Sequence, residues 1–195
     1  PSLVGSEMCI RDSNIFHTDN LTSESGDNAT FKIAMNAIPN DGEKVVLYAS
    51  VVKTDAGKSL ERFEAKLDNG SGSFLDNVSL TFTNANGADN QTITIRSEDD
   101  WLIDGTVNYQ VALQVDASAT TSDLFDNQTI SSLSLSNSDN DTAAIVVNVI
   151  DNTTNESGTD NASFTVRLNS QPDNSTSDGG EIVVLQLFAT QVSTL

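Results

Sequence analysis

Two distant stretches of the sequence repeat the same order of residues, and this repeat limits the possible folds more than any other feature. Residues 19–26 recur as residues 151–158, so that Glu24 corresponds to Glu156, 132 positions later. The match continues from residues 28–36 to residues 161–169, after one inserted residue. A period of this length corresponds to a whole domain rather than one turn of a solenoid. We therefore expect one domain followed by the first part of a second copy.

Within the first copy, apolar and polar residues alternate along short segments, which is typical of half-buried β-strands. Turn sequences separate these segments, and Gly42, Gly70, Gly87 and Gly105 are expected to supply a positive φ there. One segment, 60–67, also fits a helical period. The pattern predicts an all-β chain, an antiparallel β-sandwich. The expected strands are 31–35, 45–52, 60–67, 78–83, 91–96, 107–115 and 129–135.

The second copy opens with a clear apolar strand at residues 145–150, which corresponds to residues 13–18 of the first copy. Its residues 180–185 match residues 42–47, and the apolar run 182–185 has the length of a strand. We expect the second copy to contain about three strands. A fragment of that size cannot close the sheets of a sandwich, so the second copy is predicted to be truncated.

The chain is strongly acidic, with a net charge of -19 at pH 7. This charge argues against binding to nucleic acid, because phosphates need basic partners. It also argues against adhesion to anionic lipid. No apolar run approaches the length of a transmembrane helix, so membrane insertion is not expected.

Residues 3–13 resemble one reading frame of an adapter used in DNA sequencing libraries. This resemblance implies that residues 1–13 are an artefact of library preparation, as in a metagenomic fragment, and do not belong to the fold. The alternative is a native N-terminal segment that matches the adapter by chance. The segment holds Cys9, the only cysteine of the chain. Disulfide scaffolding and thiol catalysis are therefore not expected.

Four carboxylates fall within seven residues, 98–104, between the predicted strands 91–96 and 107–115. Asp99, Asp100 and Asp104 repel one another when placed this closely, and a hard dication that accepts several oxygen ligands relieves the repulsion. The alternative is a solvated acidic turn without a ligand. On this loop alone both interpretations stay open.

Four short motifs follow one another along the chain: Ser-Glu-Ser-Gly at 23–26, Asp-Asn-Gly-Ser-Gly at 68–72, the acidic loop 99–105, and Asp-Asn-Asp at 139–141. In this order they resemble the motifs of Calx-β type repeats, which are found in sodium/calcium exchangers and in many bacterial surface proteins. The resemblance covers residues 14–141 and again residues 142–195. It implies an immunoglobulin-like β-sandwich with a calcium site at one end.

The resemblance also implies which residues bind Ca²⁺. Two departures from the family pattern, the junction Ser-Asp-Asn-Asp at 138–141 and Val107 in place of an acid, favour one or two weakly bound ions. The alternative to ligation by Glu24 is that this residue lies in an exposed turn. The alternative for Asp139 and Asp141 is that they only keep a linker soluble. The implied ligands are the carboxylates of Glu24, Asp68, Asp99, Asp100, Asp104, Asp139 and Asp141, with a backbone carbonyl near Leu102.

From these features we expect a calcium-binding structural repeat. We expect it to belong to a long secreted or cell-surface protein of bacterial type. Calcium would stiffen a tandem array used in adhesion or matrix attachment. The expected partners are neighbouring repeats of the same chain, and a cell-surface glycan or protein. The alternative is a carbohydrate- or protein-binding accessory module of an extracellular enzyme, using Trp101, although we expect Trp101 to be buried or packed at an edge.

Catalysis is not expected. The chain has no zinc-protease motif, nucleophile elbow or phosphate loop, and its single histidine, His17, is expected to be structural. A pair of carboxylates could in principle act as in a glycosidase. A sandwich end crowded with acids resembles a cation site more than a substrate cleft.

Overall fold

The computed structural model describes residues 13–17, 19–54, 65–125, 128, 130–172 and 182–190. Residues 1–12, with Cys9 and most of the adapter-like segment, lie outside this range, as do residues 60–64 of one predicted strand. Contacts between residues divide the chain into two units. The first comprises the described residues up to Asp100 together with Asp104–Asn140, and the second comprises Trp101–Ile103 together with the described residues from Asp141 onward.

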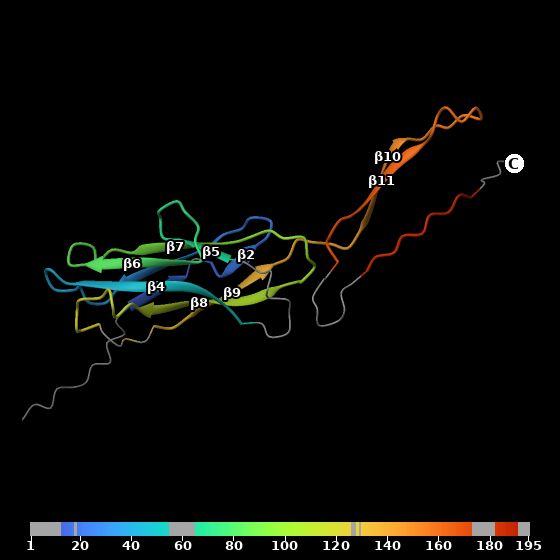
Figure 1. Ribbon diagram of the computed structural model, residues 1–195. Helices are drawn as coiled ribbons and strands as arrows, with labels where there is room; N and C mark the ends of the chain where they lie inside the picture. The colour runs from blue at the N-terminus through green and yellow to red at the C-terminus, as the bar shows by residue number, and fades with distance from the viewer. Residues whose placement is uncertain are drawn as a thin grey trace, which may run out of the picture. The chain divides into compact units, whose positions relative to one another are not determined.

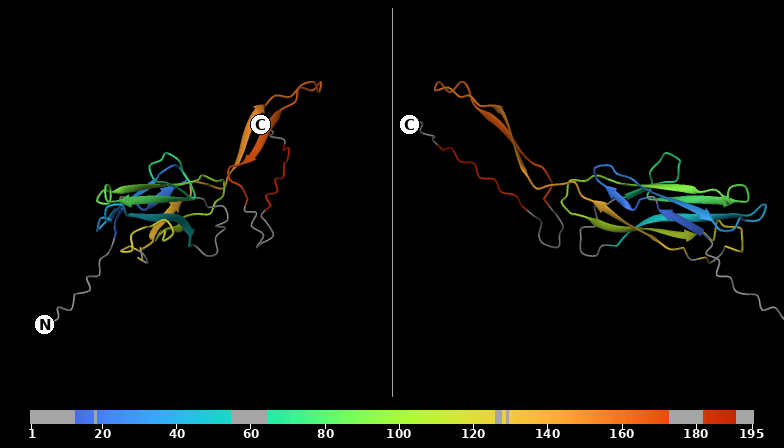
Figure 2. Two further views of the ribbon diagram at one scale, coloured as in Figure 1. Left: turned by 60° about the vertical axis from the view of Figure 1, so that its left-hand side comes forward. Right: turned by 180° about the vertical axis from the view of Figure 1, so that it is seen from behind.

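The first unit is a β-sandwich of two sheets (Figures 1 and 2). Among the described residues there is no helix. The all-β sandwich predicted from the alternation is therefore confirmed. One sheet has the order β1 (Ser13–His17), β3 (Ala29–Met35), β7 (Gln91–Ser97), β5 (Ala65–Asp68). The other has the order β2 (Leu21–Ser23), β9 (Leu133–Ser138), β8 (Val107–Val115), β4 (Lys44–Lys53), β6 (Asn77–Thr83).

The core lies between the two sheets and is built from every second residue of the strands. In β3 the buried positions are Ala29, Phe31, Ile33 and Met35, while Lys32 between them is exposed. The other sheet contributes residues such as Phe82, which is fully buried. Since side chains alternate across a strand, this pattern sets the register of each strand.

Most predicted strands coincide with observed ones, but the last strand of the first copy is displaced. It was expected at 129–135, and the structure has β9 at Leu133–Ser138, while residue 129 lies outside the described residues. The inward face of β9 carries Leu133, Leu135 and then Asn137, which is fully buried. A buried asparagine interrupts the apolar alternation, so the sequence pattern placed the end of the strand too early.

Strand β2 was not predicted at all. It has only three residues and pairs with β9 in parallel, Thr22 opposite Asn137. Every other strand pair of the first unit is antiparallel. A strand of three residues is too short to show a period, and its pairing joins distant parts of the chain.

The glycine turns behave as expected at three of the four positions. Gly42, Gly70 and Gly105 have φ of 80°, 91° and 67°. The expectation of a positive φ at Gly87 is wrong. A Cβ at Gly87 would lie 2.9 Å from the carbonyl oxygen of Thr83, so close approach of the backbone, not a left-handed conformation, requires glycine there.

The second unit contains a two-stranded antiparallel sheet of β10 (Ile145–Asp151) and β11 (Ser163–Leu168). The turn between them repeats one in the first unit. The amide of Gly26 donates to the carbonyl of Ser23, and the amide of Gly158 donates to that of Asn155, both glycines having a positive φ. The predicted strand at 182–185 is wrong, because residues 182–190 form no strand and Ile182 and Val184 are exposed. In the part of the chain that the structure describes, no strand pairs with this segment to accept and donate its backbone hydrogen bonds.

No helix in the described part of the chain is long and apolar enough to cross a membrane.

Candidate metal centre

Glu24 is the buried carboxylate around which the candidate site is built. It follows β2 directly, and its amide donates to the carbonyl of Ser138 at the end of β9, 3.1 Å away. This bond continues the parallel ladder by one residue and holds Glu24 at the edge of the sheet. Only 7% of its surface is exposed, so the alternative of an exposed turn is wrong for this residue.

A chain of hydrogen bonds between buried polar side chains leads to the carboxylate of Glu24. The side-chain amide of Asn137 donates to Glu24 Oε1 at 3.4 Å, and the hydroxyl of Thr22 donates to Asn137 Oδ1 at 3.0 Å. Thr22 also bonds the hydroxyl of Tyr109 at 3.0 Å. Burial raises the pKa of Tyr109 to about 12, which keeps its hydroxyl protonated. These bonds orient the Glu24 carboxylate.

The segment after β9 brings further oxygen atoms to the same end of the sandwich. One carboxylate oxygen of Asp139 lies within 4.8 Å of one of Glu24. Asp139 Oδ2 accepts a hydrogen bond of 2.7 Å from the amide of Gly105, and Asn140 donates from its side chain to Asp99 Oδ1 at 3.0 Å. The acidic loop and the segment after β9 are thus tied together.

The electrostatics of the group are visible in the pKa of Glu24, which is raised from 4.5 to about 7. Burial is the largest cause, and the negative charges of Asp100, Asp139 and Asp104 add to it. The amide of Asn140, which donates to Glu24 Oε2 at 3.4 Å, opposes the increase. The negative charges of three aspartates therefore act on the buried Glu24, and a bound dication would offset this repulsion.

Asp68 is not among the acidic residues of the described part of the chain whose carboxylate oxygens lie within 4.8 Å of one another, and its ligation of Ca²⁺ stays a prediction. It ends β5 opposite Thr94, three residues before the end of β7 at Ser97, where the acidic loop begins. At roughly 3.3 Å per residue, this places it roughly 10 Å back along the strand. Its Oδ1 accepts bonds from the amides of Gly70 and Gly72, so the carboxylate caps its own turn.

Two of the predicted ligands belong to the second unit. Leu102 is buried and forms a parallel bridge with Gln171. Asp141 follows Asn140 directly in the chain and is the first residue of the longer segment of the second unit. Ligation of Ca²⁺ by Leu102 or Asp141 stays a prediction.

Sequence reasoning missed Asn137 and Asn140, which contact the carboxylates of Glu24 and Asp99. A signal for Asn137 was present in the sequence, since it lies two and four residues after Leu135 and Leu133 and so faces inward if the strand continues. No comparable signal exists for Asn140, whose contacts depend on the folding of two distant loops.

Trp101 differs from expectation. It was predicted to be buried or packed at an edge, but 62% of its surface is exposed. Its carbonyl accepts a hydrogen bond from the amide of Gln171, so the backbone is held while the indole ring faces outward.

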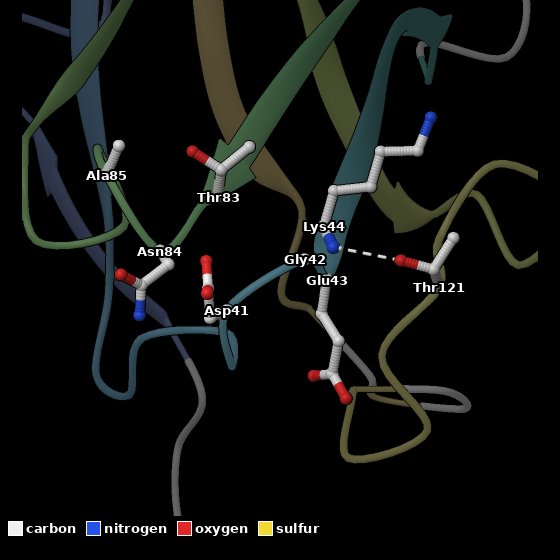
Figure 3. Close-up of a pocket in the computed structure, with 8 residues that line it drawn as sticks. All are labelled: Asp41, Gly42, Glu43, Lys44, Thr83, Asn84, Ala85 and Thr121. Carbon is white, nitrogen blue, oxygen red and sulfur yellow. Dashed lines mark hydrogen bonds between the residues drawn. The ribbon is translucent and has the colours of Figure 1, made fainter.

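A separate shallow pocket of about 360 Å³ lies at the other end of the first unit (Figure 3). It is lined by residues at the start of β4 and the end of β6, among them Lys44, Thr83 and Asn84. The amide of Lys44 donates to the hydroxyl of Thr121 at 2.9 Å. Glu43 accepts a hydrogen bond of 2.6 Å from Ser122, which lowers the pKa of Glu43. These bonds fix the turn before β4. None of the residues that line the pocket is buried, so the pocket does not indicate a ligand.

Replacing Asn137 by alanine is expected to destabilise the first unit by about 1–3 kcal/mol, because Glu24 and Thr22 lose a buried hydrogen-bond partner. Urea denaturation measures this change. Ser134→Ala on the exposed face of the same strand is the control and should change the free energy of unfolding by less than about 0.5 kcal/mol. Equal effects of the two substitutions would show that the network is not a stabilising contact.

No family model matches the sequence. No curated protein matches it. Among solved structures, the chain is similar to the crystal structure of the apo form of the Calx CBD1 domain, with a TM-score of 0.36 and 11% identity. The match covers 66% of this chain and 98% of that one. A similarity at this level carries no argument about family or function, so both depend on the residues described above.

Proposed function

We propose that the first unit is a calcium-binding module in which Glu24 and Asp139 supply the central oxygens. The observation that carries the proposal is the buried Glu24, whose pKa is raised to about 7 by burial and by the charges of Asp100, Asp139 and Asp104. Ca²⁺ takes six to eight oxygens in flexible geometry and suits carboxylates contributed by separate loops. The site uses oxygen donors only, which favours Ca²⁺ over softer metals.

Calcium is expected to stabilise the folded first unit by mass action, because Glu24 and Asp139 meet only in the fold. At a free concentration 100 times Kd the gain is about 2.7 kcal/mol, which corresponds to roughly 5–10 °C in Tm. The measurement is a thermal melt of the full chain by circular dichroism, with excess Ca²⁺ and then with chelator.

The variant Glu24→Gln with Asp139→Asn should abolish this increase in Tm. The matched control is Glu156→Gln, which changes the repeat counterpart of Glu24, an exposed residue of the second unit, and should leave the response to Ca²⁺ intact. Identical melting curves of the unmodified chain with Ca²⁺ and with chelator would contradict the proposal.

The wider role that fits such a module is structural. We place it in a long secreted or cell-surface protein, where extracellular Ca²⁺ is abundant enough for a weak site to be filled and to stiffen a tandem array. Adhesion or attachment to a matrix is the use we propose for this array. The proposed role is binding rather than catalysis.

A second candidate function is supported by one observation, the exposure of Trp101. Exposed indole rings stack on apolar faces of sugars, so carbohydrate binding is the alternative. Binding to a glycan array that survives chelation and is lost in Trp101→Ala would favour this function. Loss of glycan binding on chelation would instead connect it to the calcium site.

A further inference from the structure

Strand β6 lies at the edge of its sheet in the first unit, and side-chain amides bind the carbonyls on its outer side. It pairs with β4, and no other strand of the described part of the chain pairs with it. Asn69 donates to the carbonyl of Ser79 at 2.9 Å. Asn86 and Gln91 donate to the carbonyl of Thr81 at 3.1 and 2.8 Å. Because these carbonyls are already bonded, they are not open to another strand, and the three side-chain amides protect this edge.

Two of the three protecting residues are followed by glycine. Asn69-Gly70 and Asn86-Gly87 are the only Asn-Gly pairs of the sequence. Asparagine deamidates most readily before glycine, because a residue without a Cβ lets its backbone nitrogen approach the preceding side chain. Both residues thus have the local sequence for this reaction, and their surroundings in the fold decide which of them reacts.

Asn86 is held in place by several hydrogen bonds. Its Oδ1 accepts from the amide and from the hydroxyl of Thr83, at 2.6 and 3.0 Å, and its Nδ2 donates to Thr81. The amide of Gly87, whose nitrogen would attack, donates to the carbonyl of Thr83 at 2.8 Å, and Gly87 is buried. Reaction at Asn86 therefore requires the whole turn to open first.

Asn69 is held far less firmly. Both Asn69 and Gly70 are exposed, and among the described residues the side chain of Asn69 bonds only to the carbonyl of Ser79. The amide of Gly70 donates to Asp68 Oδ1 at 3.0 Å. A carboxylate that accepts this hydrogen bond increases the electron density on the nitrogen that would attack. The reaction at Asn69 needs the opening of one exposed hydrogen bond rather than of a buried turn.

We propose that Asn69 is a site of spontaneous deamidation, and that this modification removes its protection from the edge of β6. The backbone nitrogen of Gly70 forms a bond to Asn69 Cγ and gives up its proton. The Cγ–Nδ2 bond breaks, and Nδ2 takes up a proton and leaves as ammonia. Water then breaks one of the two C–N bonds of the resulting succinimide, which gives aspartate or isoaspartate. The new carboxylate only accepts hydrogen bonds, so it cannot donate to the carbonyl of Ser79.

The modification is tested by incubating the full folded chain in mildly alkaline buffer and measuring deamidation at each site by peptide mapping with mass spectrometry. Asn69 is expected to react at least about tenfold faster than Asn86, because Asn86 reacts only through local opening. In a chain unfolded by urea the two rates should agree within about threefold, since glycine follows both residues. Equal rates in the folded chain would overturn the proposal. A tenfold preference that persists in urea would also overturn it, because the local sequence would then be the cause.

The effect on the edge is tested with Asn69→Asp, which has the side chain of the aspartate product. The amide of Leu75 donates to the carbonyl of Leu67 in the turn that the Asn69 side chain holds against β6. Hydrogen exchange of this amide, followed by NMR, is expected to become about threefold faster in the variant. Asn90→Asp adds the same charge at another exposed position and should leave the exchange unchanged. Equal exchange of Leu75 in the two variants would show that Asn69 does not hold the turn against β6, contrary to the proposal.

Discussion

Replacing Phe31 by alanine is expected to lower the free energy of unfolding of the first unit by about 3–5 kcal/mol. Phe31 is 1% exposed and packs between the two sheets, in register with Ile93 on β7 and His17 on β1. Removing the ring loses its transfer free energy and leaves a cavity that neighbouring strands cannot fill. Urea denaturation followed by circular dichroism measures the change.

The internal repeat offers a matched control for this substitution. Phe164 is the counterpart of Phe31, on a strand of the same register, but it is 48% exposed. Phe164→Ala is therefore expected to change the free energy of unfolding of the first unit by less than about 0.5 kcal/mol. Comparable losses in both variants would mean that Phe164 is packed as tightly as Phe31, contrary to the structure.

The second large effect is a pH dependence that originates in Glu24. Its pKa is about 7 in the folded chain and near 4.5 in the unfolded chain. Between these values the folded state holds a proton that the unfolded state has lost, so stability falls as pH rises from about 4.5 to 7. The free energy of unfolding is expected to decrease by about 3 kcal/mol. A series of urea denaturations from pH 4.5 to 8, in the presence of a chelator, measures this decrease.

Glu24→Gln isolates this contribution, since glutamine has the same shape and cannot ionise. In chelator at pH 8 the variant is expected to be more stable than the unmodified chain, and the difference should vanish near pH 4.5. Excess Ca²⁺ at pH 8 should remove the advantage of the variant, because only the unmodified chain gains a bound ion. A variant that shows the same pH dependence as the unmodified chain would assign the effect to other carboxylates.

The strands of the first unit were predictable where burial follows strict alternation. Strand β8 was placed correctly from Val107 to Val115, because its inward residues Val107, Tyr109, Val111 and Leu113 are all apolar or aromatic. Prediction failed where the inward residue is polar, as at Asn137 in β9. It failed again at residues 182–185, because an apolar run forms a strand only when a neighbouring strand pairs with it.

The candidate site was predictable in composition but not in arrangement. Acidic loops could be recognised from Asp99, Asp100 and Asp104, yet nothing local in the sequence indicates that Glu24 is buried or that Asp68 caps its own turn. These outcomes depend on the parallel pairing of β2 with β9 and on the register of β5. Contacts between residues far apart in the chain are not encoded in any local pattern.

The pairing of β2 with β9 also constrains the order of events during protein synthesis. Thr22 bonds Asn137 across a separation of 115 residues, so β2 leaves the ribosome long before its partner exists. At about 5–20 residues per second, this delay lasts roughly 6–23 seconds. Closing so long a loop is a late step in folding. Glu24 thus stays in contact with solvent, and accessible to chaperones, until almost the whole first unit has been translated.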